Sequence, residues 1–333
     1  MASLSTDRIL GSLLGTAVGD ALGMPIEGRS HTNVRTYYKG IKEYRDDEQR
    51  GDLQAGQWTD DTQFTFAVAR VVADTASPEA WPEAIAEQYV ALRNDARRWG
   101  PTTTSAIDRL AEGVAPDASG DAERPTNGAA MRAAPLGLWW AAADVDRSTA
   151  LQALRPVLEV THRHPVALCA GWGQAAAVYF IARTSPDDFN RDAFWNFLVD
   201  TTAWGEDQLD TASHLSDRLQ RVVPHLDDFP LDLRDACGGV GVRADESWPF
   251  ACAMVARRPH LLENTLLSGI NVGGDADTTG AMMGALLGAF HGWSAFPDGW
   301  TTNLEAVDSL EQQAQDLADR LRTGTGPRIN NNL

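Results

Sequence analysis

Glycine recurs at every fourth position in two segments near opposite ends of this 333-residue chain. The first glycine row is Gly11, Gly15, Gly19 and Gly23, and the second glycine row is Gly280, Gly284 and Gly288. Residues four apart lie on one face of an α-helix, where each glycine costs about 1 kcal/mol relative to alanine. Close approach of another backbone is the packing reason for such a face. If the two rows meet each other or a common neighbour, both ends of the chain belong to one core, which favours one large domain.

Helical patterns dominate the rest of the chain. Segments rich in alanine and leucine are separated by glycine, proline and short polar clusters, whereas alternating runs of Val, Ile and Thr are almost absent. A cap and a first-turn proline at 77–79 predict one helix, and an apolar stripe predicts another over 303–322. We predict an all-α fold, with a single compact multi-helix domain over residues 1–322 and a flexible C-terminal tail over 323–333.

The charge balance restricts the possible partners. The chain has 28 Lys and Arg against 46 Asp and Glu, a formal net charge of −18, so we expect no nucleic-acid partner. Three scattered cysteines indicate neither a disulfide framework nor a paired-cysteine zinc site. The first residues lack the features of a secretory signal, and the most apolar stretches fall short of the roughly 18 uncharged residues that a membrane helix needs. We therefore expect a cytoplasmic protein with no membrane partner.

The most distinctive polar feature is an acidic segment at the start of a predicted helix. The sequence GQWTDDT at 56–62 contains Thr59, Asp60 and Asp61 and precedes a helical run over 63–73. One Asp is explained by capping, because its oxygen accepts from an unpaired N–H group and its charge suits the helix dipole. Two adjacent Asp flanked by Thr exceed that need, and hard cations such as Mg²⁺ prefer oxygen ligands. From this segment alone, capping and metal binding are about evenly matched.

A second acidic segment precedes the second glycine row. The sequence NVGGDADTT at 271–279 places Asp275, Asp277 and Thr278 after two glycines, which permit a tight turn. A Gly-Gly-Asp turn before a helix is common and is only suggestive by itself. If the glycine-row helices bring the two acidic segments together, four Asp converge and require cations. Two divalent ions, roughly 3.5 to 4 Å apart, are then the natural number.

Two further polar segments have simpler explanations as well as functional ones. In TNGAAMR at 126–132, backbone N–H groups and Arg132 could hold a phosphate, although an asparagine cap and a surface arginine account for the same residues. His162 and His164 could bind a metal, but no His or Cys partner is evident. A hydrogen-bonding or stacking role, or entry into the helix at Pro165, is therefore the simpler interpretation.

Glu27 and Asp20 lie beside the first glycine row. Pro25 ends the predicted helix, which leaves Glu27 in a loop. A loop glutamate is usually a solvated charge, and only a position next to the acidic segments would make Glu27 a catalytic candidate. Asp20 could cap or pair with a neighbour, and Trp58 would shape the site beside the first acidic segment.

In their order along the chain, these segments resemble the motifs of the ADP-ribosylglycohydrolases, the family that includes the dinitrogenase-reductase-activating glycohydrolase and the ADP-ribosylarginine and ADP-ribosylserine hydrolases. The resemblance rests on residues 11–28, 56–62, 127–132, 161–165 and 271–280. It implies a central binuclear cleft whose two Mg²⁺ (or Mn²⁺) ions are held by Thr59, Asp60, Asp61, Asp275, Asp277 and Thr278. It also implies substrate binding by Asn127, Gly128, Met131, Arg132 and His162, with Glu27 on a mobile loop beside the distal ribose.

That family cleaves the glycosidic bond at C1″ of the distal ribose. The resemblance therefore implies a hydrolase that takes an ADP-ribosylated protein or small molecule and releases ADP-ribose. Our mechanistic hypothesis gives catalytic roles to Glu27, Asp60 and Asp61: the metals bind ribose hydroxyls and a water, and Glu27 or a metal-side Asp accepts the proton. Two alternatives stay open, namely a catalytically silent ADP-ribose-binding protein of the crystallin type and a two-metal nucleotide phosphohydrolase.

One departure from the family pattern bears on the linkage that is cleaved. Arginine-specific relatives carry an acidic residue in a loop whose counterpart here is RRWGPTTT at 97–104, and this segment contains no acid. The difference puts arginine specificity in doubt and leaves serine-linked and small-molecule substrates open.

Overall fold

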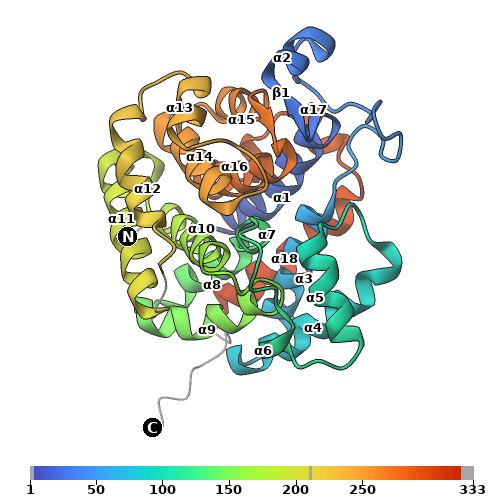
Figure 1. Ribbon diagram of the computed structural model, residues 1–333, viewed down its shortest axis with the longest axis vertical. Coiled ribbons are helices and arrows are strands. Elements are labelled where there is room, and N and C mark those ends of the chain that lie inside the picture. The colour runs from blue at the N-terminus through green and yellow to red at the C-terminus, as the bar shows by residue number, and fades with distance from the viewer. Residues whose placement is uncertain (1–3, 210–211, 324–333) are drawn as a thin grey trace.

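The two glycine rows meet each other at the centre of the molecule. In the computed structural model, which describes residues 4–209 and 212–323, α1 (Thr6–Gly23) lies antiparallel to α16 (Ala276–His291) (Figure 1). The facing pairs are Gly11 with Gly288, Gly15 with Gly284, Gly19 with Gly280, and Gly23 with Ala276. A Cβ atom at any of these glycines would lie closer than 3.0 Å to the carbonyl oxygen of its partner. The predicted close approach is confirmed, and both ends of the described chain share one core.

The other helices surround this pair. In chain order they are α2 (His31–Asn33), α3 (Asp60–Asp74), α4 (Trp81–Ala91), α5 (Pro101–Ala111), α6 (Pro116–Ser119), α7 (Gly128–Met131), α8 (Ala134–Ala143), α9 (Arg147–Glu159), α10 (Pro165–Arg183), α11 (Arg191–Gln208), α12 (Leu215–Val222), α13 (Pro230–Ala236), α14 (Ala244–Arg257), α15 (Leu262–Ile270), α17 (Asp298–Thr302) and α18 (Val307–Arg322). Short 3₁₀ turns lie at Met24–Ile26, Pro78–Ala80, Leu92–Asp95, Pro186–Asp188, Val223–His225 and Trp293–Ala295, and a π turn lies at Val34–Tyr38. The sheet in the described residues is a pair of two-residue strands, β1 (Arg29–Ser30) and β2 (Gly273–Gly274). The predicted all-α class is confirmed.

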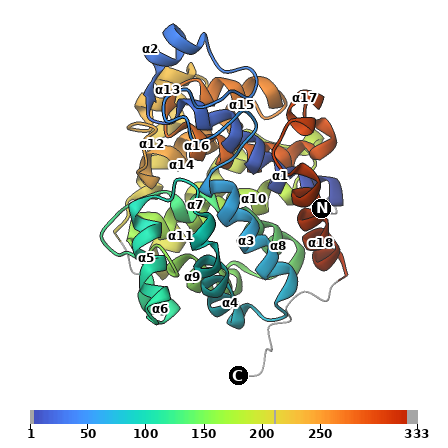
Figure 2. The same ribbon diagram turned by 90° about the vertical axis from the view of Figure 1, so that its right-hand side faces the viewer.

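Each neighbour covers one side of the central pair. Helices α10 and α7 pack on α16, and α8 packs on α10 and α1. Helices α14 and α15 cover another side of α16, and α3 and α18 pack against α1. Figure 1 shows α11 and α12 at one outer edge and α4, α5 and α6 together at another, and Figure 2 shows α3 running beside α8 and α18. Buried Arg8 joins three of these helices, because its Nε donates to Ala289 O (2.5 Å) and its Nη2 donates to Ile181 O (2.6 Å).

Two predicted helices are present with later starts. Residues Pro78–Ala80 form a 3₁₀ turn with Ser77 as its N-cap, so α4 begins only at Trp81. Helix α18 begins at Val307 because Ala306 before it has a left-handed backbone, with φ 54°. The tail that the sequence predicts over 323–333 lies outside the described residues, except for Thr323.

Two helical segments, Thr6–Ile26 and Pro165–Arg183, are long and apolar enough to cross a membrane by length and composition. The prediction that the most apolar stretches fall short of a membrane helix is therefore wrong for the stretch that begins at Pro165. In this fold, 94% and 83% of their most apolar windows are buried. Their hydrophobicity is thus accounted for by the protein core, since the core helix of a globular protein meets the same criterion.

Candidate active site

The pairing of α1 with α16 places the end of one helix beside the start of the other. Gly23 faces Ala276, and the chain then turns through Glu27 into β1, where Arg29 pairs with Gly274. Gly28 N donates to Gly274 O at 2.7 Å. Gly274 has a φ of 74°, a left-handed conformation that glycine adopts readily. This short ladder holds the Glu27 loop against the start of α16.

The start of α3 is capped by a residue of α1. The carboxylate of Asp20 accepts from the backbone N–H groups of Thr59 (3.0 Å) and Thr62 (3.0 Å), and from their hydroxyls at 2.9 and 2.6 Å. Burial raises the pKa of Asp20 to about 6, and these hydrogen bonds oppose the rise. The expectation that Asp20 caps or pairs with a neighbour is confirmed. Because Asp20 serves as the cap, Asp60 and Asp61 are not needed for it.

The acids at the start of α16 are also largely free of capping bonds. Asp275 is the N-cap residue of α16, but its side chain makes no capping hydrogen bond within the described structure. Instead, Asp275 Oδ2 accepts from the side-chain amide of Asn127 at 2.6 Å. Asp277 Oδ1 accepts from Thr278 N at 3.0 Å. Capping therefore explains part of the role of Asp277 and does not explain Asp275.

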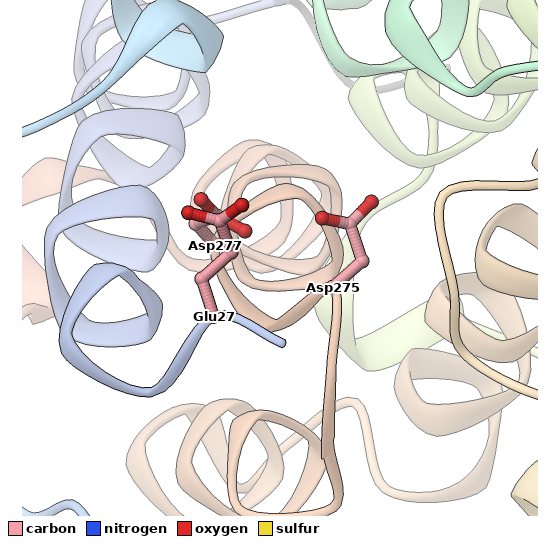
Figure 3. A group of neighbouring side chains, drawn as sticks. All are labelled: Glu27, Asp275 and Asp277. Atoms are coloured by element: carbon pink, nitrogen blue, oxygen red, sulfur yellow. The ribbon is translucent and has the colours of Figure 1, made fainter. Parts of the chain in front are cut away.

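The two helix starts and the Glu27 loop converge on one acidic cluster, defined as Glu27, Asp60, Asp61, Asp275 and Asp277. Carboxylate oxygens of Glu27, Asp275 and Asp277 lie within 4.8 Å of one another, and Figure 3 shows Glu27 rising from its loop toward the two Asp side chains at the start of α16. Thr278 Oγ1 donates to Asp61 Oδ2 at 3.2 Å, which joins α16 to α3. The structure thus brings together all six residues that the resemblance gives as metal ligands, together with Glu27.

Burial and mutual repulsion perturb these carboxyl groups. Burial raises the pKa of Asp61 and Asp277 well above the usual range, and neighbouring carboxylates raise both further. Burial also raises the pKa of Asp60 well above its usual range, against the opposing effect of the Arg132 charge. The pKa of Asp275 rises to about 6 for the same reason. The cluster therefore needs positive charge in order to hold all of its carboxylates ionised.

The donor set fits a hard divalent cation. Oδ1 of Asp61 is buried and has no hydrogen-bond partner among the described residues, although buried polar atoms are almost always paired. Every side-chain atom that the predicted ligands could offer to a metal ion is an oxygen, from a carboxylate or a hydroxyl. Mg²⁺ and Mn²⁺ prefer such ligands, and a bound cation would supply the missing partner of Asp61.

An open cleft leads to the acidic cluster. Its empty volume is about 610 Å³, a figure that includes open solvent at its mouth. The predicted residues that line it are Glu27, Asp60, Asn127, Gly128, Met131, His162, Asp275, Asp277 and Thr278. Other lining residues come from the segment 97–104, namely Arg98 and Gly100–Thr103. The loop that the sequence analysis relates to linkage specificity is therefore part of the cleft wall.

The wall beyond the acidic cluster is built around His162. Burial lowers the pKa of His162 well below its usual range, so the imidazole is neutral. Its Nε2 lies 3.0 Å from Thr126 Oγ1 and its Nδ1 lies 2.9 Å from Thr161 Oγ1. A Cβ at residue 128 would lie only 2.6 Å from the His162 ring, so Gly128 is required for this packing. His164 instead accepts from Val166 N and caps α10, as the helix-entry interpretation expects.

Arg132 lies one layer behind this wall. Its side chain is buried, its Nε donates to Gly128 O at 2.5 Å, and its Cζ lies 4.3 Å from the centre of the Phe64 ring. It is not among the described residues that line the cleft. The interpretation of Arg132 as a surface arginine is therefore wrong, because the guanidinium packs on an aromatic ring and binds the backbone of the first residue of α7.

Sequence reasoning missed two arginines that bind Glu27. Arg50 Nη1 lies 2.5 Å from Glu27 Oε2, and Arg98 Nη1 lies 3.4 Å from the same oxygen. Both ion pairs join segments that are distant in sequence, so no local spacing could have indicated them. The sequence feature that could have drawn attention to Arg98 is the dipeptide Arg97-Arg98, which lies in the segment 97–104 that bears on linkage specificity.

Comparisons with known proteins agree with this geometry. The model of the ADP-ribosylglycohydrolase family matches residues 1–327. An uncharacterised protein of Archaeoglobus fulgidus is 30% identical over 93% of this chain and 96% of its own length. The ADP-ribosyl-[dinitrogen reductase] glycohydrolase of Rhodospirillum rubrum is 29% identical over 93% of this chain and 94% of its own. A solved structure described as an ADP-ribosylglycohydrolase-related protein complex superposes with a TM-score of 0.75 at 26% identity, covering 95% of this chain and 98% of that one. The chain therefore belongs to the ADP-ribosylglycohydrolase family, whose enzymes hydrolyse glycosidic bonds of ADP-ribose.

Proposed function

We propose that this enzyme depends on two divalent cations and cleaves the bond at C1″ of ADP-ribose in ADP-ribosylated proteins or small molecules, releasing ADP-ribose. The observation that carries the proposal is the convergence of two acidic helix starts. Capping does not account for Asp60, Asp61 or Asp275, because Asp20 caps α3 and Asp275 makes no capping bond within the described residues. Buried carboxylates in this number are costly without a cation.

The metal ligands would come equally from the two helix starts. Thr59, Asp60 and Asp61 of the α3 start and Asp275, Asp277 and Thr278 of the α16 start would hold two Mg²⁺ or Mn²⁺ ions. Bound cations of this kind supply a Lewis acid for ribose hydroxyls and lower the pKa of water. The unpartnered, buried Oδ1 of Asp61 supports this assignment.

The rest of the cleft would hold the ADP-ribosyl group. We place the diphosphate and the adenosine along Asn127, Gly128, Met131 and His162, which line the wall beyond the acidic cluster. Both ring nitrogens of neutral His162 already pair with Thr126 and Thr161, so its ring would shape this wall without adding a charge. Arg132 would act on the phosphates only through its charge, since it lies behind Gly128.

Glu27 is the residue best placed to move a proton. Its carboxylate lies within 4.8 Å of those of Asp275 and Asp277, on the loop that β1 and β2 hold beside α16. It would accept a proton from the water that attacks C1″, and Asp60 or Asp61 is the alternative acceptor. The neighbouring carboxylates would stabilise positive charge that develops on the ribose during cleavage.

The test is release of free ADP-ribose from ADP-ribosyl-serine peptides, ADP-ribosyl-arginine peptides and a small-molecule ADP-ribosyl glycoside, each with Mg²⁺ and with EDTA. We expect release that depends on Mg²⁺ and that falls at least a thousandfold in Asp275→Asn. Asp117→Asn, which changes an exposed acid on α6, serves as the matched control and should retain activity.

The identity of the product separates the proposal from its alternatives. AMP as the product would identify a nucleotide phosphohydrolase. Binding of ADP-ribose without release from any of the substrates would identify a catalytically silent binding protein. Release that is equal with EDTA and with Mg²⁺ would contradict the role of the metals.

A further inference from the structure

Asp275 is held by the side-chain amide of Asn127, and this amide is held in turn by Ser247 on the first turn of α14. Asn127 Nδ2 donates to Asp275 Oδ2 at 2.6 Å and to Ser247 Oγ at 3.0 Å. All three residues are buried, and Ser247 has no exposed surface at all. Ser247 is not among the described residues that line the cleft, so its hydroxyl reaches the acidic cluster only through Asn127.

The direction of these hydrogen bonds follows from the chemistry of the partners. A hydroxyl group has one hydrogen to donate, and Ser247 Oγ donates it to Arg243 O at 3.0 Å. Ser247 therefore accepts from Asn127. The ionised carboxylate of Asp275 can only accept. Because both partners require an N–H group, the Asn127 amide is fixed with its nitrogen between them.

The loop before α14 holds the backbone at both ends of this contact. Val242 O accepts from Asn127 N at 3.0 Å. Two residues earlier in the loop, Val240 O accepts from Asp275 N at 2.7 Å. With the two backbones held by one loop, rotation of the side chains is the freedom that remains, and the contact between amide and carboxylate restricts it.

The same bonds leave Asn127 without a donor for the substrate. Both N–H groups of its amide are engaged by Asp275 and Ser247, and its backbone N–H group is engaged by Val242. A phosphate group accepts hydrogen bonds and is recognised by donors. Asn127 therefore borders the place of the diphosphate without donating to it, and its side chain serves the acidic cluster instead.

We infer that Asn127 and Ser247 are positioning residues for Asp275: the hydroxyl of Ser247 orients the amide, and the amide holds the carboxylate in the orientation in which it would bind a metal ion. This inference rests on the proposed function. Carboxylates that bind metals are commonly oriented by such outer partners, and loss of the partner weakens metal binding by about 10 to 100-fold.

The experiment measures the dissociation constant of Mn²⁺ by titration calorimetry of the full chain, freed of metal beforehand. Asn127→Leu has a similar volume and no donor, and it should weaken Mn²⁺ binding at least about tenfold. Ser247→Ala keeps the bond between Asn127 and Asp275, so its effect should be smaller, about threefold. The matched control is Ser12→Ala, which removes a buried hydroxyl of α1 that has no partner among the described residues; it should leave the constant unchanged.

Two further measurements separate positioning from a general loss of structure. Because Ser247 acts through Asn127, the double variant Asn127→Leu/Ser247→Ala should bind Mn²⁺ no more weakly than Asn127→Leu alone. At saturating Mn²⁺, the affinity of Asn127→Leu for ADP-ribose should stay close to that of wild type, since no donor to the diphosphate is lost. Unfolded protein lowers the stoichiometry of the titration and leaves the dissociation constant of the folded fraction unchanged.

The outcomes distinguish this inference from the proposed function. Equal Mn²⁺ affinity in wild type and Asn127→Leu, or a further loss in the double variant, would overturn the inference. Weaker ADP-ribose binding with unchanged Mn²⁺ binding would also overturn it and make Asn127 a substrate ligand. In each of these cases, metal-dependent release of ADP-ribose would still support the proposed function. A wild type that binds no Mn²⁺ would overturn both.

Discussion

At the scale of single residues, buried carboxylates destabilise this fold when no cation is bound. Asp61 has a buried oxygen with no partner among the described residues, and its pKa is raised by burial and by neighbouring charges. Because the folded pKa is higher than the unfolded one, the folded state binds the proton more tightly. The stabilisation that comes from this tighter proton binding is fully present below about pH 4, and it is lost as the pH rises through the pKa of the folded state. At neutral pH, the cost of holding the carboxyl group of Asp61 in this buried, acidic site therefore opposes folding.

The Asp61→Asn substitution tests whether the charge of Asp61 lowers the stability of the metal-free protein. In EDTA at pH 7.5, the free energy of unfolding should increase by about 1 kcal/mol or more, because the amide keeps an acceptor for Thr278 Oγ1 without the buried charge. At pH 4.5 the gain should shrink, since more of the carboxyl group of the wild type is already protonated. Denaturant unfolding at the two pH values measures the effect, with Asp117→Asn as the control. A loss of stability at pH 7.5 would show that the charge of Asp61 supports the fold.

At the scale of secondary-structure elements, the contact between α1 and α16 decides where the acids lie. The backbones approach so closely that a single methyl group cannot fit between facing glycines. Gly23 faces Ala276 at the end of this contact, and the acidic helix start and the Glu27 loop follow directly from it. The glycine rows therefore serve the candidate active site as well as the core.

Gly19→Ala tests the packing of these two helices. Its Cβ would overlap the carbonyl group of Gly280, and neither backbone can move without shifting a whole helix. We expect a loss of at least about 3 kcal/mol in the free energy of unfolding, at the upper end of overpacking effects. The matched control is Gly299→Ala on α17, where nothing lies within 4 Å of the added Cβ; it should be neutral or stabilising by about 0.5 kcal/mol. Equal effects of the two substitutions would contradict the account.

The spacing of residues in the sequence predicted the helices better than it predicted which side chains contact each other. Glycines four apart indicated a helix face in close contact, and acids before helical runs indicated candidate ligands. The hydrogen bonds from Thr59 and Thr62 to Asp20 span about 40 residues of sequence, so capping and metal binding could not be separated beforehand. Arg132 shows the same limit, because its burial depends on the Phe64 ring from another helix. Local pattern carries information on residue type and periodicity, whereas partner choice depends on packing of distant segments.

At the scale of the whole molecule, the proposed metal ligands connect the two ends of one core. Asp61 and Thr278 are 217 residues apart and share a hydrogen bond. Cation binding should therefore stabilise the described domain as a unit, since the site exists only when α1, α3 and α16 are assembled.

Calorimetry of the wild type with and without Mg²⁺ tests this coupling. At a Mg²⁺ concentration one hundred times the dissociation constant, the free energy of unfolding should rise by about 2.7 kcal/mol per site, as a shift of one cooperative transition. The Asp275→Asn variant should lose most of the shift. Two separate transitions, of which only one moves with Mg²⁺, would show that the ends of the chain fold independently.

The central claim is that the starts of α3 and α16 together form one two-metal site beside Glu27. Anomalous diffraction from crystals soaked with Mn²⁺ at the manganese edge tests it most directly. The account predicts two anomalous peaks roughly 3.5 to 4 Å apart, one or both within bonding distance of Asp61 and Asp277, and loss of at least one peak in Asp275→Asn. Peaks away from this cluster, or none at Mn²⁺ concentrations that support turnover, would contradict it.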